Sequence, residues 1–156
     1  MITEHLAQLN VGRLLHRQDD PRVAEFMDNL DFVNGVAERS PGFVWRYTDE
    51  SGAATDTKVF DDPDVILTLT VWESAEALEH FVFKTVHHKF YGKRHDWFDK
   101  AFGPALVMWW IPAGTLPTVE DALARYEKFK AEGPSADAFG WAGVAQAELW
   151  KTARCA

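Results

Sequence analysis

Cysteine is almost absent from this sequence of 156 residues, in which Cys155 is the only one. A single cysteine allows no intrachain disulfide and none of the metal sites built from paired cysteines. The longest apolar run, residues 105–112, is too short to span a bilayer. The first residues also lack the basic and apolar regions of a signal peptide. These absences predict a cytoplasmic protein that does not enter a membrane.

Positive charge is scarce as well, because 16 lysine and arginine residues stand against 24 aspartate and glutamate residues, for a formal net charge of −8. An acidic chain without a basic stripe repels phosphate backbones, which argues against nucleic acid as a partner. The sequence also lacks a glycine-rich phosphate loop, a G-x-S-x-G nucleophile motif and an H-E-x-x-H zinc motif. It therefore offers no familiar catalytic motif.

What the chain does contain is a large apolar and aromatic share, with 47% hydrophobic residues, 7 tryptophans and 11 phenylalanines. So many large flat side chains need a core, a cavity or an interface to bury them. The length and composition are typical of a single folded domain. We assign that domain to residues 1–135 and treat residues 136–156, which are rich in alanine and glycine, as a C-terminal tail.

Hydrophobic periodicity predicts four strands and three helices. The strands are expected at residues 5–15, 43–48, 65–72 and 105–111. The helices are expected at residues 21–39, 74–98 (with a break near Gly92) and 118–132, and a polar loop at 49–64. The order β-α-β-β-α-β is that of the ferredoxin-like fold. We therefore predict an α+β domain of ferredoxin-like topology with an extra C-terminal helix.

The third predicted strand has one wholly apolar face and one mixed face. The apolar face, which we expect to pack under the two crossover helices, consists of Val65, Leu67, Leu69 and Val71. The mixed face carries Ile66, Thr68, Thr70 and Trp72, and continues on the first strand with Leu6, Gln8, Asn10 and Gly12. A mixed face of this kind suits a lined cavity. Two such sheets face to face would also satisfy the need for burial in a homodimer.

Among the six histidines, His87 stands out because aromatic residues fall at helical spacing around it. Phe83 precedes it by one turn, and Phe90 and Tyr91 follow it by one turn. Arg94 follows on the same predicted helix. An imidazole among flat rings, with cations nearby for carboxylates, suits a porphyrin. The alternative is a histidine at the edge of the core.

Two side chains of the mixed face are further candidates. Asn10 either satisfies a neighbouring backbone group or points at a ligand. Trp72 either packs in the core or lines a pocket. A dedicated zinc site is weakly supported, because His80 and His87 lie two turns apart on the helix, about 10.5 Å along its axis.

Four segments of the sequence resemble an uncharacterised bacterial family. They are LAQLNVGRL at residues 6–14, SPGFVWR at 40–46, TVWES at 70–74 and VMWWIPAG at 107–114. That family is placed among the dimeric α+β barrels, alongside the antibiotic-biosynthesis monooxygenases. The resemblance covers residues 3–140 and implies a homodimer that forms a dimeric α+β barrel.

Residues 70–87 also resemble the heme-degrading monooxygenases of the staphylococcal iron-acquisition type. The strand end TVWES, followed by VFKTVH at residues 82–87, is similar to two pieces of their motif. The resemblance implies His87 as the axial ligand of the heme iron and Asn10 as a distal hydrogen-bond donor. The intervening segment is about one helical turn shorter here, and Phe81 stands where those enzymes carry a tryptophan.

These observations lead to three hypotheses. The first is a heme-binding, monooxygenase-like oxidoreductase that activates oxygen or peroxide and acts on a small hydrophobic substrate, with Asn10, Trp72 and His87 at its catalytic centre. The residues expected around the heme are Phe81, Phe83, His87, Tyr91 and Arg94. The second is a cofactor-independent monooxygenase, isomerase or cyclase for an aromatic or polyketide-like substrate, with His87 as the base. The third is a non-catalytic protein that binds a small hydrophobic ligand.

Overall fold

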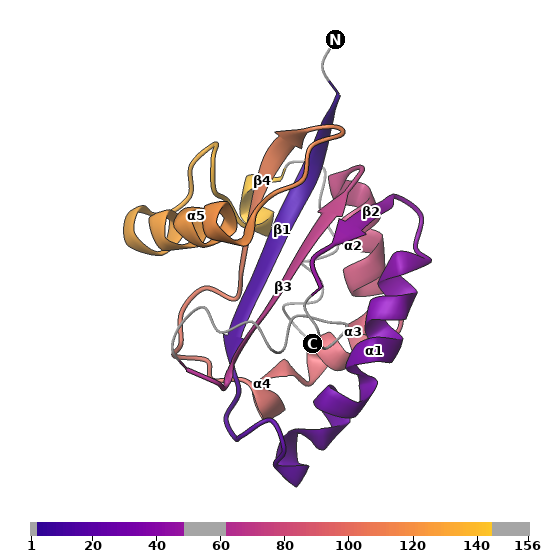
Figure 1. Ribbon diagram of the computed structural model, residues 1–156, viewed down its shortest axis with the longest axis vertical. Helices are drawn as coiled ribbons and strands as arrows, with labels where there is room; N and C mark the ends of the chain where they lie inside the picture. The colour runs from indigo at the N-terminus through magenta and orange to yellow at the C-terminus, as the bar shows by residue number, and fades with distance from the viewer. Residues whose placement is uncertain (1–2, 49–61, 145–156) are drawn as a thin grey trace.

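The computed structural model describes residues 3–48 and 62–144, which form an α+β domain (Figure 1). The strands are β1 (Glu4–Arg13), β2 (Phe43–Arg46), β3 (Val65–Trp72) and β4 (Leu106–Pro112). The helices are α1 (Ala24–Glu38), α2 (Ala75–Lys84), α3 (His87–Gly92), α4 (Arg94–Trp97) and α5 (Val119–Glu132), with short 3-10 helices η1 (Pro21–Val23) and η2 (Trp141–Gly143). This order confirms the predicted ferredoxin-like fold class with an extra helix.

The four strands form one antiparallel sheet in the order β2-β3-β1-β4. The inner strand β1 pairs with β3 on one side and β4 on the other, so that Leu9 lies between Leu69 and Val107. Because side chains alternate between the two faces of a strand, each row of paired residues points to one face. A side chain in the middle of β1 therefore lies at the centre of the sheet.

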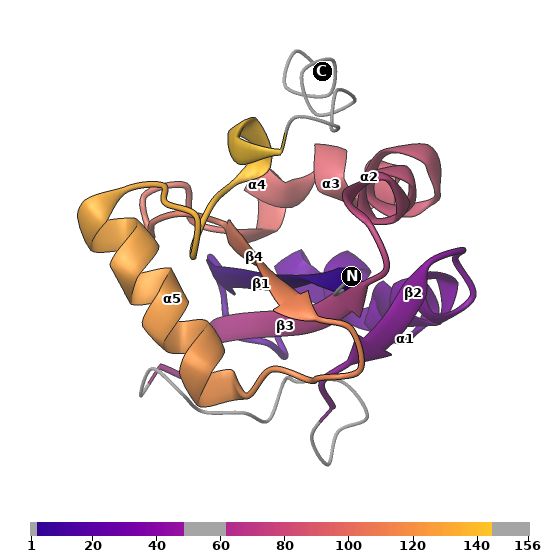
Figure 2. The same ribbon diagram turned by 90° about the horizontal axis from the view of Figure 1, so that it is seen from above.

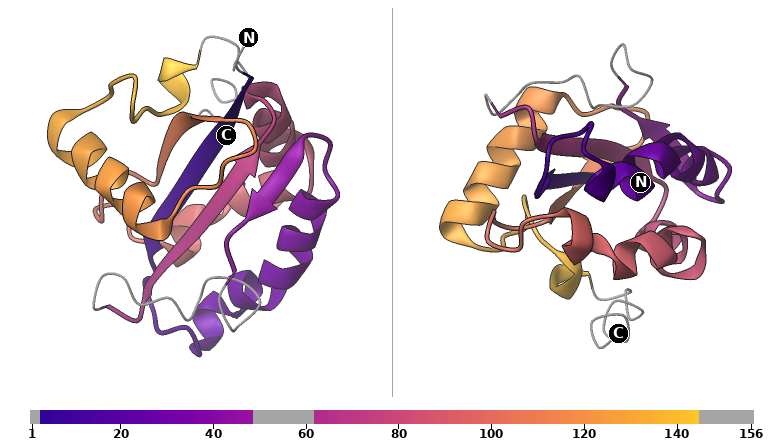
Figure 3. Two further views of the ribbon diagram at one scale, coloured as in Figure 1. Left: turned by 45° about the horizontal axis from the view of Figure 1, so that its top comes forward. Right: turned by 90° about the horizontal axis from the view of Figure 1, so that it is seen from below.

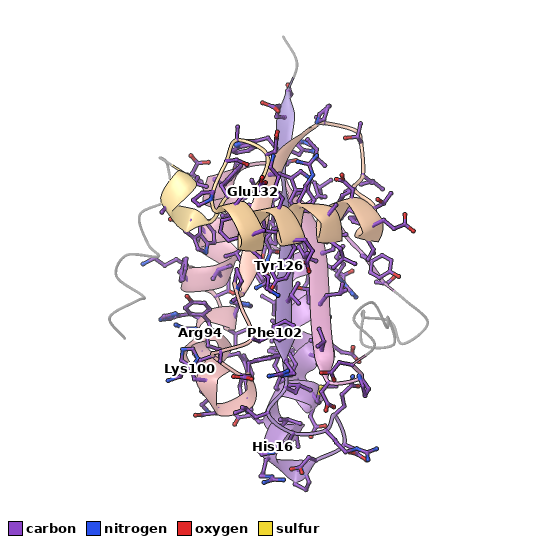
Figure 4. All side chains as sticks on the ribbon, turned by 90° about the vertical axis from the view of Figure 1, so that its left-hand side faces the viewer. His16, Arg94, Lys100, Phe102, Tyr126 and Glu132 are labelled. Carbon is purple, nitrogen blue, oxygen red and sulfur yellow. The ribbon has the colours of Figure 1, made fainter. Side chains whose placement is uncertain are left out.

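The wholly apolar face of β3 packs against α5, which corrects the expectation that it lies under the two crossover helices. Leu67, Leu69 and Val71 share a buried cluster with Tyr126 of α5. The Tyr126 hydroxyl donates a hydrogen bond of 2.9 Å to the Pro104 carbonyl and holds α5 across the strands (Figure 4). Alternation alone did not reveal this, because helices cover both faces of the sheet and both faces therefore carry apolar side chains.

The other four helices cover the mixed face, so that the strands separate α5 from α1–α4 (Figures 1 and 2). Two buried clusters form there. The Trp72 cluster contains Leu6, Ala37, Trp72, Ala75, Leu78, Phe81, Met108, Phe139 and Val144. The Trp97 cluster contains Leu14, Val23, Ile66 and Trp97.

The helix predicted over residues 74–98 is broken twice. The second break follows Gly92, as predicted, but the first, between α2 and α3, was not predicted. It occurs at Thr85, whose backbone is extended (φ −118°, ψ −174°) and whose hydroxyl donates a hydrogen bond of 2.6 Å to the Phe81 carbonyl. The apolar pattern continues through Thr85, and so the periodicity gave no sign of the break.

The chain after α5 crosses the edge of β4 to the side of the sheet covered by α1–α4 (Figure 3). Phe139 pairs with Met108 through two backbone hydrogen bonds of 2.8 and 2.9 Å. Trp141 of η2 then packs against Phe83, with ring centroids 5.6 Å apart. Residues 136–144, which the sequence placed in the tail, thus pack against the sheet and α2. The rest of the tail, including Cys155, lies outside the described residues.

Within the described ranges, no helix is long and apolar enough to cross a membrane. Most of the predicted polar loop at residues 49–64 also lies outside those ranges.

Candidate functional site

The face of the sheet that α1–α4 cover is open at its centre, above Asn10. Asn10 is exposed although it lies in the inner strand, between Thr68 of β3 and Leu106 of β4. The Trp72 cluster closes the face on one side of this row, and the Trp97 cluster closes it on the other. An exposed side chain at such a position marks an opening between the helices, which we name the Asn10 opening.

Two residues of β1 bound the Asn10 opening along the strand. Gln8, on one side, is only 6% exposed. Gly12, on the other side, lies under the Phe98 ring so closely that a Cβ atom at Gly12 would be 2.7 Å from a ring carbon. These two residues are about 13 Å apart along the strand. That length suits a molecule of one to a few rings.

A chain of hydrogen bonds links three residues at the Gln8 end. The indole nitrogen of Trp72 donates to the Thr70 hydroxyl at 3.0 Å, and the Thr70 hydroxyl donates to Gln8 Oε1 at 2.7 Å. The Trp72 ring is fully buried and stacks on Phe81, with centroids 5.2 Å apart. Trp72 therefore supports the wall of the site through Thr70 and Phe81.

His87, at the first position of α3, lies against the same aromatic wall. Its ring centroid is 4.8 Å from that of Phe81 and 6.4 Å from that of Tyr91. Its Nδ1 atom is 3.2 Å from the Val82 carbonyl oxygen, a pairing that places the proton on Nδ1 and the lone pair on Nε2. Among the described residues, Nε2 has no hydrogen-bond partner.

Burial lowers the pKa of His87 to about 4, against the opposing effect of its hydrogen bond to the Val82 carbonyl. The imidazole is therefore neutral near pH 7. A neutral imidazole with a free Nε2 lone pair accepts a proton or binds a metal ion.

The aromatic stripe that the sequence predicted around His87 does not form as expected. Because the helix breaks at Thr85, Phe83 contacts Tyr91 and Trp141 and has no ring contact with His87. Phe90 turns toward Trp97, at 6.1 Å between centroids. Of the predicted neighbours, Tyr91 remains beside His87, while Phe81, one turn before the break, packs directly on it.

The site meets one requirement of a heme pocket. The hydrogen bond from Nδ1 to a carbonyl orients His87 in the manner of an axial ligand. Two nearby cations that could pair with propionates are engaged elsewhere, since Arg94 of α4 lies 4.0 Å over the Tyr91 ring and Lys93, between α3 and α4, pairs with Glu25 at 2.7 Å. The surroundings therefore favour a smaller ligand without carboxylates. Among the described residues, no three histidine, cysteine, aspartate or glutamate side chains gather as a metal site.

Gln8 and Thr70 were not predicted as site residues from the sequence. Both are polar residues on the mixed face, but their contact depends on the pairing of β1 with β3, which places them opposite one another. The local sequence does not indicate which residue of β3 pairs with Gln8.

A family model described as a domain of unknown function (DUF3291) matches residues 5–155 of this chain. No curated protein matches it.

Among solved structures, a variant of SnoaB, a cofactor-independent oxygenase from Streptomyces nogalater, is 15% identical, with a TM-score of 0.48 over 73% of this chain and 98% of that chain. A second SnoaB structure is 12% identical, with a TM-score of 0.46 over 74% and 97% of the two chains. NE2512, a protein of unknown function from Nitrosomonas europaea, is 12% identical, with a TM-score of 0.47 over 76% and 99%. These similarities are too distant to transfer a function, and the resemblance to heme-degrading enzymes gains no support from them.

Proposed function

We propose that this chain, which belongs to the DUF3291 family, is a cofactor-independent enzyme that binds a small, largely apolar organic molecule in the Asn10 opening. One observation carries the proposal: Asn10 is exposed in the inner strand, on a sheet face that two buried clusters otherwise close. A pocket that is mostly apolar, with a few polar groups, is the usual form of a small-molecule site.

His87 is the proton acceptor in this proposal. Its Nε2 lone pair takes a proton from an acidic C–H or O–H group of the substrate, and the electron pair stays on the substrate. Return of the proton to another atom makes the reaction an isomerisation or cyclisation. In the oxygenase version, dioxygen converts a substrate methylene into a carbonyl and releases water, so that the substrate supplies all four electrons.

Heme binding is the second candidate function, and the orientation of His87 by the Val82 carbonyl favours it. We rank it lower because Arg94 and Lys93 are already engaged. In that version Nε2 of His87 would hold the heme iron, and the heme would supply the redox chemistry.

The first experiment is calorimetric titration of the purified protein with 1-tetralone, a two-ring aromatic ketone. Asn10→Trp fills the opening and is expected to abolish binding. Asp31→Trp places the same side chain at an exposed position of α1 and is expected to leave binding unchanged. Equal binding by the wild type and Asn10→Trp contradicts a ligand site in the Asn10 opening.

A parallel titration with hemin separates the two candidates. A Soret shift that saturates at one heme per chain and is lost in His87→Ala supports the heme function. Without such a shift, and with tetralone binding that depends on Asn10, the cofactor-independent function is supported.

A further inference from the structure

The direction of the hydrogen bonds between Trp72, Thr70 and Gln8 follows from the donors and acceptors that each group offers. An indole nitrogen donates and never accepts, so the Thr70 oxygen accepts from Trp72 at 3.0 Å. The Thr70 oxygen could accept a second hydrogen bond, but if the Gln8 amide nitrogen faced it, the Thr70 hydroxyl proton would have no acceptor within the described residues. The Thr70 hydroxyl therefore donates to the amide oxygen of Gln8, 2.7 Å away. The hydrogen-bond network therefore places the oxygen of the Gln8 amide, and not its nitrogen, on the side of Thr70.

The amide nitrogen of Gln8 is left without a partner as a result. Gln8 is only 6% exposed, yet its Nε2 atom has no hydrogen bond within the described residues. Solvent still reaches this nitrogen. The fully buried side-chain atoms without a hydrogen bond, within the described residues, are Nδ1 of His5, Nδ1 of His88 and Nε1 of Trp109, and Gln8 Nε2 is not one of them. The Gln8 amide nitrogen is therefore an unsatisfied hydrogen-bond donor that a ligand can reach.

Gln8 borders the Asn10 opening and shares its face. Gln8 and Asn10 are alternate residues of one strand, so their side chains point the same way and start about 7 Å apart. Thr68, the partner of Asn10 on β3, is also uncharged. The sheet side of the opening therefore presents uncharged amide and hydroxyl groups, whose N–H and O–H donors suit an oxygen that carries partial or full negative charge.

We infer that Gln8 donates a hydrogen bond to a carbonyl oxygen of the substrate, which is thus an aromatic or cyclic ketone with an acidic C–H beside the carbonyl. This inference rests on the proposed function and names its substrate class. When His87 takes the proton, the C–H bond breaks, its electron pair moves into the C–C bond, and the carbonyl becomes an enolate. The Gln8 amide, oriented by Thr70 and Trp72, stabilises the enolate oxygen.

The test compares 1-tetralone with tetralin, which has the same rings without the carbonyl. The wild type is expected to bind tetralone about tenfold more tightly, the usual effect of one hydrogen bond to a buried donor. Gln8→Met removes the donor at similar size, and Thr70→Val releases the Gln8 amide from its fixed orientation. Both variants are expected to lose most of the preference. Gln18→Met, at a glutamine that contacts Pro63 outside the sheet, is the matched control and is expected to keep it.

A second measurement uses the wild type alone, in case the variants do not fold. The side-chain amide signal of Gln8, located in NMR spectra through its contacts to Thr70, is expected to shift with tetralone and not with tetralin. If both probes bind equally and the signal does not move, the role of Gln8 is refuted while the ligand site stands. If neither probe binds, the proposed function and this inference both fail.

Discussion

At the residue scale, His87 couples the site to the stability of the fold. An unfolded histidine has a pKa near 6.5, whereas burial lowers the pKa of His87 to about 4. Above pH 6.5 the imidazole is neutral in both states. Between pH 6.5 and 4 the unfolded state binds a proton that the folded state does not, so stability falls as the pH falls.

His87→Gln is therefore expected to weaken the loss of stability on acidification. Between pH 7 and 4, its free energy of unfolding should fall less than that of the wild type, by about 2–3 kcal/mol. Urea unfolding at the two pH values measures the difference. His80→Gln, at an exposed position of α2, should follow the wild-type curve. If His87→Gln follows it too, the site is wetter than its burial indicates.

The activity that we propose for this chain should follow the same titration. With His87 as the base, kcat/KM is expected to rise as the pH increases through about 4 and to stay level near neutrality, because the free base is then fully present. A pH–rate profile with a ketone substrate measures this. A rise centred near pH 6.5 would indicate a solvated histidine in its place.

Gly42 is the second residue on which the local structure depends, at the turn before β2. Its φ is +85°, and a Cβ atom there would overlap the Cβ of Ala77. Gly42→Ala is expected to cost about 2–4 kcal/mol of stability, through backbone strain and overlap with α2. The double variant Gly42→Ala/Ala77→Gly should recover only the part of the lost stability that is due to the overlap, because the backbone strain remains. Gly92→Ala, with nothing within 4 Å, should change stability by less than about 1 kcal/mol. Thermal unfolding compares the three.

At the element scale, α2 positions the site and α5 covers the opposite face. Each helix is capped at its N-terminus by a side-chain hydroxyl. The Ser74 hydroxyl accepts a hydrogen bond from the Ala77 amide at 3.1 Å, and the Thr118 hydroxyl accepts one from the Asp121 amide at 3.1 Å. The two caps therefore make a matched pair.

Ser74→Ala and Thr118→Ala are each expected to cost about 1 kcal/mol of stability. Only Ser74→Ala should also weaken tetralone binding, because α2 carries Phe81 and leads into His87. Denaturant unfolding and calorimetry measure the two effects. An equal effect of both variants on binding would mean that α2 does not position the site.

The order and type of most elements were predictable, while the positions of the site residues were not. The alternation over residues 65–72 gives β3 with the bounds observed, because alternation is a local property. The spacing of Phe83 and His87 misled, since Thr85 interrupts the helix between them. Helical spacing places two residues on one face only while the helix is continuous.

At the scale of the whole molecule, the segment after α5 closes one edge of the fold. The Phe139 side chain is buried in the Trp72 cluster, and its backbone pairs with Met108. Phe139→Ala is therefore expected to cost about 3–5 kcal/mol of stability. Phe32→Ala, at a phenylalanine that is 54% exposed, should cost less than about 1 kcal/mol. Equal losses in chemical unfolding would mean that the segment does not contribute to the core.

The homodimer expected from the sequence stays a prediction, but one reason for it is gone. The mixed face, which was expected either to line a cavity or to meet a partner sheet, is largely covered by α1–α4 of the same chain, and the apolar face of β3 packs against α5. A dimer has no apolar sheet face left to cover at that position. Sedimentation equilibrium, which distinguishes the 17.7 kDa protomer from its dimer, tests the prediction.

The sequence by itself determined the order of the strands and helices, the mixed face of β1 and β3, and the presence of His87 beside aromatic residues. These follow from composition and short-range periodicity. Only the tertiary structure decided that α5 covers the apolar face, that Gln8 lies opposite Thr70, and that Asn10 is exposed between two buried clusters. The physical reason is that strand pairing brings together segments far apart in the chain, and the burial of any one side chain depends on how all of these segments pack.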